Sequence, residues 1–265
     1  MKFEFRRKHL GIPYILFMLF FVVLPLLVIC YYAFTNGQGK FSVENFLGFF
    51  QNTKTIGTLL YSLVLSVVTT LVCLIIAYPV AYILANGGIK HRNAILLLFV
   101  LPMWINFTLR ITAMKEILTV LEHNLAFHPF LNSVICMTYD FLPFMILPLY
   151  NSLTKIDRAY MEAAADLGAK HTTVFLRIVL PLSVPGIVSG VTMVLLPAMT
   201  NYVVLDMVYN STYIMGSLIG SYFNSYDWHN GSVIAIILLM IIFAITLVTG
   251  HFSEEKEDRR GGTVL

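Results

Sequence analysis

The stretch that decides the fold is DRAYMEAAADLGAKHTTVFLRIVLP, residues 157–181, a polar segment inside an otherwise apolar chain. Asp157 is a good helix N-cap because its carboxylate accepts hydrogen bonds from free backbone N–H groups, and the alanines that follow it favour helix. Gly168 can adopt the left-handed conformation that ends a helix. A second helical run is expected from Thr172 to Val179, stopped near Pro181. The segment is therefore predicted to be two short helices joined by a turn.

The chain around this segment is too apolar for a soluble globule. Its 265 residues are 58% hydrophobic and 12% charged, which is typical of an integral membrane protein. Several stretches without Asp, Glu, Lys or Arg exceed the roughly 20 residues that cross the hydrocarbon of a bilayer: Leu10–Gly39, Thr55–Ile89, Ile178–Leu205 and Trp228–Ser253. The sequence predicts an all-α, polytopic membrane protein with six transmembrane helices, near residues 11–34, 57–85, 94–113, 132–150, 183–205 and 231–251.

Loops rich in Lys and Arg stay in the cytoplasm, and this rule orients the six spans. With a cytoplasmic N-terminus, most of the 17 Lys and Arg residues fall in cytoplasmic segments. These are the basic N-terminus at 1–10, the turn between the second and third spans, the loop 151–182 and a solvated, partly disordered tail at 253–265. The transmembrane domain is predicted at 11–252. The net charge of +3 follows from this topology and indicates no nucleic-acid partner.

This orientation places the 157–181 segment in the cytoplasm, with both its ends close to the bilayer. Each of its helices is about ten residues or fewer, so contacts with the rest of the chain or with a partner must hold it. Two other interpretations stay open from the residues alone. The segment has the spacing of a DNA-reading helix-turn-helix, although a duplex has little access to a loop held against a membrane. It can also be a well-capped connector without a partner.

No set of residues in the sequence points to catalysis or to a metal site. The seven histidines lack the i, i+4 pairing of a metal site, and neither a pair of carboxylates nor a nucleophile motif stands out. Cys30, Cys73 and Cys136 all fall in apolar spans and are expected to be packing residues without a disulfide. The sequence therefore predicts that the chain is not an enzyme, and active transport would draw its energy from another chain.

Ionisable groups at membrane depth are a clearer signal, because a buried charge is costly unless it is paired or hydrated. Asp140 lies within the fourth predicted span and Arg110 near the outer end of the third. The two side chains can pair with each other, or Asp140 can contact a transported solute. The outer mouth adds two carboxylates beside aromatic residues, Tyr202 with Asp206 and Asp227 with Trp228. Such a combination attracts a cation through its charge and through the ring quadrupoles.

The loop carries a long motif at fixed spacing, in which Glu-Ala-Ala is followed by a glycine and then by Ile-x-Leu-Pro. The matching residues are Glu162, Ala163, Ala164, Gly168, Ile178, Leu180 and Pro181. The motif resembles the signature loop of ABC-importer permeases, with no departure from its pattern. This resemblance implies a type I importer permease in a bacterial inner membrane, with ATP-hydrolysing subunits docked on this loop.

Several further stretches extend the resemblance over nearly the whole chain. They are Pro102–Asn106, Leu109–Ile111, Leu142–Met145, Leu147–Tyr150, Leu196–Met199 and Asp227–Trp228. Together they resemble the first permease subunit of spermidine/putrescine importers. The resemblance implies a sister permease, two ATP-binding subunits that hold ATP and Mg, an extracytoplasmic polyamine-binding protein, and no cofactor in this chain. The residues expected to line or gate the path are Trp104, Asp140, Tyr202, Asp206, Asp227 and Trp228.

Two alternatives remain against a polyamine importer. The same permease architecture can carry an amino acid, a metal chelate or an oxyanion, although an anion path should place more cationic side chains in the spans than Arg110 alone. An ion-coupled secondary transporter needs carboxylates within the spans, where only Asp140 qualifies. A secondary transporter also has no ATPase partner, so the Glu162 loop would remain unexplained.

Overall fold

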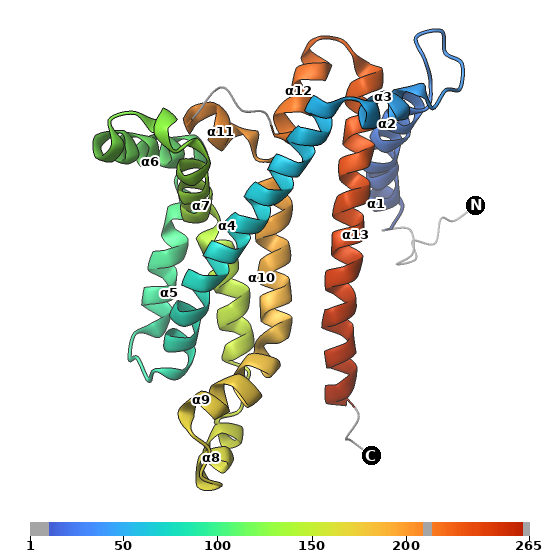
Figure 1. The fold of residues 1–265 in the computed structure, drawn as a ribbon. Helices are drawn as coiled ribbons and strands as arrows, with labels where there is room; N and C mark the ends of the chain where they lie inside the picture. The colour runs from blue at the N-terminus through green and yellow to red at the C-terminus, as the bar shows by residue number, and fades with distance from the viewer. Residues whose placement is uncertain (1–10, 209–213, 262–265) are drawn as a thin grey trace, which may run out of the picture. The chain divides into compact units, whose positions relative to one another are not determined.

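The computed structural model describes residues 11–208 and 214–261, with the side chains of Ile12 and of residues 251–261 left out, and this part of the chain is helical nearly throughout (Figure 1). Within it, the only extended pairing is one antiparallel bridge between Thr35 and Phe41. The predicted all-α class is therefore confirmed. The predicted basic segment 1–10 lies outside the described residues.

The chain divides into two compact units, and each is treated by itself. One comprises residues 1–57 and 217–241, and the other residues 58–216 and 242–265. The first unit contains α1 (Gly11–Met18), a π-helical turn (Leu19–Val23), α2 (Leu24–Ala33), α3 (Glu44–Gln51), α12 (Met215–Asn224) from residue 217 onward, and α13 (Trp228–Gly261) as far as residue 241. The rest of α13 belongs to the second unit.

The second unit holds the central helices. They are α4 (Thr53–Asn86, of which residues 58–86 belong here), α5 (Arg92–Val100), a 3₁₀ turn (Leu101–Trp104), α6 (Phe107–Glu122), a second 3₁₀ turn (Leu125–Phe127), α7 (Pro129–Leu153), α8 (Arg158–Asp166), α9 (His171–Val174), a π-helical turn (Phe175–Val179), α10 (Leu180–Thr200) and α11 (Tyr202–Val208). In Figure 1, α8 and α9 lie beyond one end of α7 and α10, and α6 and α11 lie at the opposite end.

Five helices among the described residues are long and apolar enough to cross a membrane. They are Pro13–Ala33, Thr53–Asn86, Pro129–Leu153, His171–Thr200 and Trp228–Gly250. A sixth is obtained when Arg92–Trp104 and Phe107–Glu122 are taken together as one bent span. Each of the six predicted spans therefore has a candidate helix among the described residues, and the third is bent into two.

The prediction of a continuous third span over 94–113 is wrong, because the chain bends by 98° between Trp104 and Phe107. Pro102 lies in the 3₁₀ turn, and Ile105 and Asn106 have ψ angles of 143° and 131°, which no helix contains. Asn106 then starts α6 by accepting a hydrogen bond from the Thr108 N–H at 2.9 Å. A proline followed four residues later by a good N-cap is the sequence signal for this break.

The prediction that the second short helix of the loop stops near Pro181 is also wrong. The helix runs from His171 through Pro181 to Thr200. A proline ring normally clashes with the carbonyl group four residues earlier. Here the turn Phe175–Val179 is π-helical, and the Leu180 N–H donates to the Phe175 carbonyl five residues back. The wider turn lets the helix continue, and a π turn also comes just before Pro25.

The last helix extends further than predicted. Asp227 starts α13, and the helical backbone continues from Trp228 to Gly261. The expected partly disordered tail at 253–265 is therefore helical as far as Gly261, with the remainder outside the described residues. Charged residues that favour helix, among them Glu254, Glu255 and Lys256, carry the backbone past the apolar part.

The packing centre of the second unit is α7. Its apolar window is 61% buried, whereas the corresponding window of the first span, Pro13–Ala33, has no buried part. Cys73 and Cys136 are buried as predicted, but Cys30 of the first span is exposed and so is not a packing residue within this chain. All three thiols are free of disulfides. The surface of the first span is thus available to lipid or to another chain.

Candidate functional site

The helix α8 begins and ends as the sequence predicts. The Asp157 carboxylate accepts a hydrogen bond from the Ala159 N–H at 3.0 Å. Gly168 has a φ of +81°, its N–H donates to the Ala165 carbonyl at 2.8 Å, and the Ala169 N–H donates to the Ala164 carbonyl at 3.0 Å. This pair of bonds is the Schellman arrangement, which satisfies carbonyl groups left over at a helix end. The turn after α8 is therefore fixed by backbone geometry that favours glycine.

The surface of α8 is open. None of its nine residues is buried, and Glu162 and Ala163 are both exposed. Tyr160 is 60% exposed, and Leu167, at the end of the helix, is 89% exposed. Large apolar side chains in such positions, on a helix too short to be stable alone, are typical of a surface that another molecule covers.

A cavity of about 320 Å³ separates α8 from its neighbours. It is lined by Tyr82 and Asn86 of α4, by Arg158, Met161, Glu162 and Ala165 of α8, and by Ala169, His171 and Val174. The short helix therefore touches the rest of the unit along part of its length only. The motif residues on the following helix are placed differently, since Ile178 is half-buried and Pro181 is exposed.

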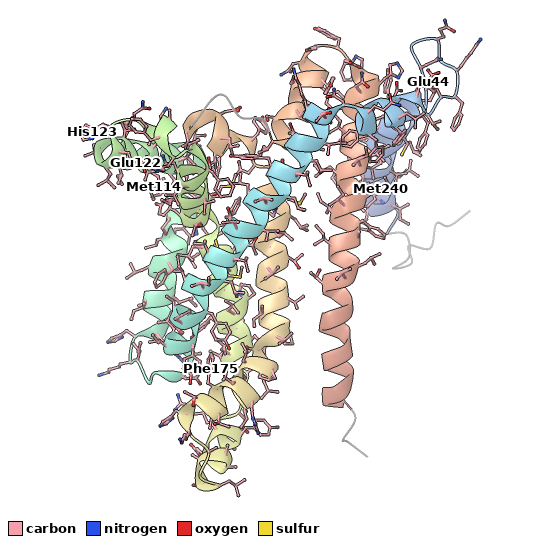
Figure 2. The ribbon with its side chains drawn as sticks, in the orientation of Figure 1. Glu44, Met114, Glu122, His123, Phe175 and Met240 are labelled. Carbon is pink, nitrogen blue, oxygen red and sulfur yellow. The ribbon has the colours of Figure 1, made fainter. Side chains whose placement is uncertain are left out.

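Phe175 joins the loop to α4 through two aromatic contacts, and it is labelled in Figure 2. Its ring meets the ring of Tyr78 at 5.7 Å and that of Tyr82 at 5.5 Å, with interplanar angles of 90° and 88°. Such edge-to-face pairs are favoured by the ring quadrupoles. The Tyr78 hydroxyl also forms a hydrogen bond of 2.8 Å with the Ser183 hydroxyl of α10. We call these four residues the aromatic clasp.

The packing of α7 against α10 depends on two glycines four residues apart, Gly186 and Gly190, which we call the glycine seam. A Cβ atom at Gly186 would collide with the Ser152 side chain and would lie 2.9 Å from the Pro148 carbonyl oxygen. One at Gly190 would lie 2.6 Å from the Met145 sulfur. Gly-x-x-x-Gly in an apolar segment is a signal for close helix contact in membranes, and these two glycines were not among the predicted site residues.

These contacts make a continuous mechanical connection. The helix that starts at His171 in the loop is the same helix that packs on α7 through Gly186 and Gly190, and it is held to α4 by the aromatic clasp. Packed interfaces of this kind move as rigid bodies, because close-packed interiors resist deformation. These contacts therefore link the loop to three membrane helices, α4, α7 and α10.

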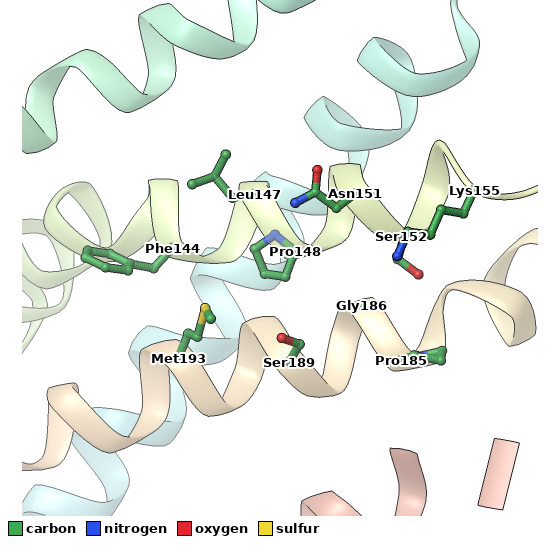
Figure 3. A pocket seen from close by; sticks show the side chains of 10 residues that line it. All are labelled: Phe144, Leu147, Pro148, Asn151, Ser152, Lys155, Pro185, Gly186, Ser189 and Met193. Atoms are coloured by element: carbon green, nitrogen blue, oxygen red, sulfur yellow. The ribbon is translucent and has the colours of Figure 1, made fainter. Parts of the chain in front are cut away.

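A second cavity, of about 500 Å³, lies on the α7 and α10 seam (Figure 3). Ser189 and Met193 point from α10 toward α7, and Phe144 and Pro148 lie on the side of α7 that faces α10. Asn151, Ser152 and Lys155 make the wall of the cavity polar toward the end of α7 that leads into α8. The cavity is thus a crevice of mixed polarity at the loop end of the two helices.

The residues predicted to line a path are divided between the two units. Tyr202 and Asp206 lie on α11, four residues apart on one face, and both are exposed. Trp104 ends the 3₁₀ turn and is 74% exposed. Asp227 belongs to the first unit and accepts hydrogen bonds from the N–H and the side-chain amide of Asn230 at 3.2 and 2.8 Å.

The neighbouring Trp228 also belongs to the first unit, where its ring lies 5.4 Å from that of Phe223 and 6.2 Å from that of Tyr32. The structure thus gives Asp227 a capping contact and Trp228 a place in an aromatic cluster. Tyr202 and Asp206 instead present a ring and a carboxylate together on an open surface.

Asp140 forms an ion pair with Arg110, so the structure shows the first of the two roles considered for it. The Arg110 nitrogen lies 2.6 Å from the Asp140 carboxylate, and the two side chains are 7% and 3% exposed. The Arg110 guanidinium also lies 5.8 Å from the centre of the Phe107 ring. Since a buried charge must be paired, this contact ties α6 to α7.

The described part of the chain contains no group of three or more His, Cys, Asp or Glu residues that could hold a metal ion. The contacts described at this site are helix caps, cavity walls and packing contacts. The exposed surface of α8 is joined through these contacts to membrane helices.

Two relatives of known type are similar to most of this chain. The spermidine/putrescine transport system permease protein PotB of Haemophilus influenzae is 34% identical over 87% of this chain and 88% of its own length. The PotB protein of Escherichia coli is 35% identical over 72% of this chain and 75% of its own length.

Solved structures share the fold. The chain resembles, with a TM-score of 0.75 and 17% identity over 94% of both chains, a component of a bacterial ABC transporter involved in the import of the acidic polysaccharide alginate. It resembles a chain of the MetNI methionine ABC transporter in an inward-facing conformation with a TM-score of 0.59 and 18% identity, over 76% of this chain and 94% of the other. At such identities these likenesses show the fold alone.

One protein-family model matches residues 77–252, which include the loop, the aromatic clasp and the glycine seam. Its description is the inner membrane component of binding-protein-dependent transport systems. Since the match covers more than half of the chain and agrees with the relatives above, this chain belongs to the family of binding-protein-dependent transport system inner membrane components.

Proposed function

We propose that this chain is the membrane-spanning permease subunit of an ATP-driven importer that carries polyamines into the cell. The observation that supports the solute most strongly is the 34% identity to a spermidine/putrescine permease over 87% of the chain. The exposed helix α8 supports the ATP-driven mechanism, because it offers a docking surface joined to the membrane helices. The same chain then needs no ATPase site of its own.

The partners follow from this role. Two ATP-binding subunits, which hold ATP and Mg, serve the transporter, and one of them docks on α8 through Tyr160, Glu162, Ala163 and Leu167. A sister permease completes the path, and an extracytoplasmic binding protein delivers the solute. An alginate transporter of similar fold has been solved in complex with a solute-bound periplasmic protein. The N- and C-termini and α8 are cytoplasmic in this arrangement, as the distribution of Lys and Arg favours.

Transport proceeds by alternating access. Closure of the ATP-binding subunits displaces α8 and α9, and the continuous helix His171–Thr200 carries that displacement into the membrane. The glycine seam moves α7 with α10, and the aromatic clasp moves α4. The path between the two permeases then opens alternately to the outside and to the cytoplasm.

The solute contact is assigned to Tyr202 and Asp206, with Trp104, Asp227 and Trp228 as further gating residues. Tyr202 and Asp206 present an aromatic ring and a carboxylate on one exposed face of α11, at the end of the unit opposite α8 (Figure 1). An amine cation is attracted to both groups. Asp140 is left out of this set because its carboxylate is held by Arg110.

The proposal is tested by purifying the chain with its associated subunits and measuring the uptake of labelled spermidine into proteoliposomes. We expect ATP-dependent uptake that excess putrescine or spermidine inhibits and that amino acids, metal chelates and oxyanions leave unchanged. Uptake blocked by one of those other solutes would overturn the polyamine assignment and leave the permease role intact. Uptake driven by an ion gradient without ATP would overturn both.

The substitution Asp206→Asn is expected to lower spermidine uptake several-fold at low substrate concentration, because it removes a negative charge from the solute contact while keeping the side-chain shape. Assembly with the other subunits should be unchanged, since Asp206 is exposed. Glu116→Gln is the matched control, because Glu116 is an exposed carboxylate at the same end of the unit. Normal uptake by Asp206→Asn would remove this residue from the path.

The substitution Phe175→Ala is expected to lower uptake per ATP hydrolysed, because α4 loses the contact that makes it follow the loop. Two edge-to-face pairs contribute about 0.5–1.5 kcal/mol each beyond area burial, so the clasp should open in a large fraction of molecules. Tyr78→Phe is the control: it keeps the rings and removes only the hydrogen bond to Ser183. Uptake and ATP hydrolysis are measured on the same proteoliposomes, and their ratio is the amount of solute taken up per ATP hydrolysed. An unchanged ratio in Phe175→Ala would show that the aromatic clasp does not transmit motion from the loop to α4.

A further inference from the structure

The second half of the broken third span, α6, turns away from the direction in which a helix crosses a membrane. It makes an angle of 98° with the segment Arg92–Trp104, and it lies at the end of the unit opposite α8 (Figure 1). Figure 2 shows Glu122 and His123 at its far end. A helix perpendicular to a spanning segment runs parallel to the plane of the bilayer.

The surface of α6 has three faces. The buried face packs on the rest of the unit and consists of Phe107, Arg110, Ile111, Met114 and Leu118. A polar face carries Thr108, Thr112, Lys115, Glu116 and Thr119. Between them lies an exposed apolar face, formed by Leu109, Ala113, Ile117, Val120 and Leu121, which covers roughly 120° of the helix at about 100° per residue.

The exposed apolar face is too large to be incidental. Leu109 is 64% exposed, Ile117 55%, Val120 75% and Leu121 70%. Trp104, at the elbow before α6, is exposed as well. A contiguous patch of this kind, bordered by polar residues, marks contact with a protein or with a membrane.

The polar face is suited to the boundary between lipid and water. The hydroxyl groups of Thr112 and Thr119 donate to the carbonyls of Thr108 and Lys115, at 2.9 and 2.8 Å. Their hydrogen-bond donors are therefore satisfied without water. Lys115 and Glu116 supply the charges that remain in water. An amphipathic helix with such a face lies in the plane of the interface.

The length of the segment Arg92–Trp104 determines how deep α6 lies in the bilayer, and this depth agrees with an interfacial position. Arg92–Trp104 has 13 residues, and a helix of that length rises about 20 Å, roughly 10 Å less than the hydrocarbon thickness of a bilayer. With Arg92 at the cytoplasmic boundary, α6 lies roughly 10 Å below the outer boundary of the hydrocarbon. Interfacial helices bury their apolar faces by about 5–10 Å, which agrees with this position.

From these observations we infer that α6 is an interfacial helix, which lies flat in the outer leaflet with the face Leu109, Ala113, Ile117, Val120 and Leu121 in contact with lipid. The third predicted span therefore crosses the membrane only as far as Trp104. The Arg110 and Asp140 ion pair fixes the helix to α7 in this orientation. The inference depends on the membrane location of the chain and not on which solute it carries.

The test places single spin labels on α6 in the complete transporter, reconstituted in lipid bilayers. Cys30 is first replaced by serine, because it is the exposed thiol among the three, and Cys73 and Cys136 are buried. Labels are attached through Val120→Cys and Ile117→Cys on the apolar face and through Lys115→Cys on the polar face as the matched control. The collision of each label with oxygen, which concentrates in lipid, is compared with its collision with a water-soluble nickel complex.

We expect the oxygen-to-nickel ratio at positions 117 and 120 to exceed that at position 115 several-fold. Low access of both reagents to positions 117 and 120 would show that a protein, such as the sister permease, covers this face, and would overturn the lipid contact. Preferential access of nickel at these positions would place the face in water and would overturn it as well. Each result is independent of the uptake assays described above.

Discussion

Replacing Gly168 with aspartate is expected to uncouple ATP hydrolysis from solute uptake while the chain still inserts into the membrane and assembles. Gly168 has a φ of +81°, and a left-handed conformation costs a residue with a side chain about 1–2 kcal/mol. A Cβ atom at this position meets no atom within 4 Å, so the cost falls on the backbone turn alone. The turn relaxes, its hydrogen bonds weaken, and α8 is no longer held at a fixed angle to α9.

The structure offers a matched control at Gly88, in the turn between α4 and α5. Gly88 also has a positive φ, +65°, and open space around its Cβ position, but it lies outside the α8 to α9 loop. Gly88→Asp should retain normal coupling. Gly168→Asn should have an intermediate effect, because asparagine is the residue that sometimes replaces glycine in the left-handed position at a helix end. Uptake and ATP hydrolysis at wild-type levels in Gly168→Asp would refute the role assigned to this turn.

Replacing Gly186 with alanine is expected to destabilise the whole second unit. The added methyl group collides with the Ser152 side chain and presses on the Pro148 carbonyl, so α10 must move away from α7. Overpacking of this kind costs about 1–3 kcal/mol and occasionally more. The thermal midpoint of the detergent-solubilised complex, followed by size-exclusion chromatography, should fall markedly, and uptake should fall with it.

Two further variants separate this clash from a general effect of alanine. A Cβ atom at Gly250, in α13, meets no atom within 4 Å. Gly250→Ala should therefore leave the stability unchanged or slightly higher, because alanine has a higher helix propensity than glycine. Ser152→Gly in the Gly186→Ala background removes one of the two colliding groups and should restore part of the lost stability. A Gly186→Ala variant as stable as the wild type would show that the seam tolerates a wider helix separation.

Local features of the sequence predicted local features of the structure. The N-cap Asp157 and the helix-ending Gly168 act on neighbouring backbone groups, and both have the predicted geometry. Length and apolar composition likewise located the spans, because a helix that crosses lipid must satisfy its own backbone. The motif from Glu162 to Pro181 indicated the family that residues 77–252 match.

Features that depend on contacts between distant segments were harder to predict. A proline stops a helix in one context and is accommodated by a π turn in another, and Pro181 belongs to the second case. The break at Asn106 had a sequence signal, but the apolar residues on both sides of it resembled one continuous span. The ion pair of Arg110 and Asp140 was one of two alternatives, and only the three-dimensional arrangement of α6 and α7 distinguishes them.

The glycine seam shows a signal that was present and not used. Gly186 and Gly190 lie four residues apart in an apolar helix, and this spacing indicates close packing. The spacing does not show which helix packs against these glycines. Only the structure shows that α7 supplies the atoms that leave no room for a side chain. Cys30 was misjudged for a related reason: an apolar span has the same composition whether it faces its own chain or the lipid.

The most direct measurement of the central claim is a photo-crosslink from position 163, which lies on the exposed surface of α8. A photoreactive amino acid replaces Ala163, the assembled transporter is irradiated in native membranes, and mass spectrometry identifies the attached protein. The proposed coupling role predicts a crosslink to the ATP-hydrolysing subunit, with a yield that changes when ATP is added. Attachment to an extracytoplasmic protein, or no attachment to the ATP-hydrolysing subunit in an assembled and active complex, would contradict it.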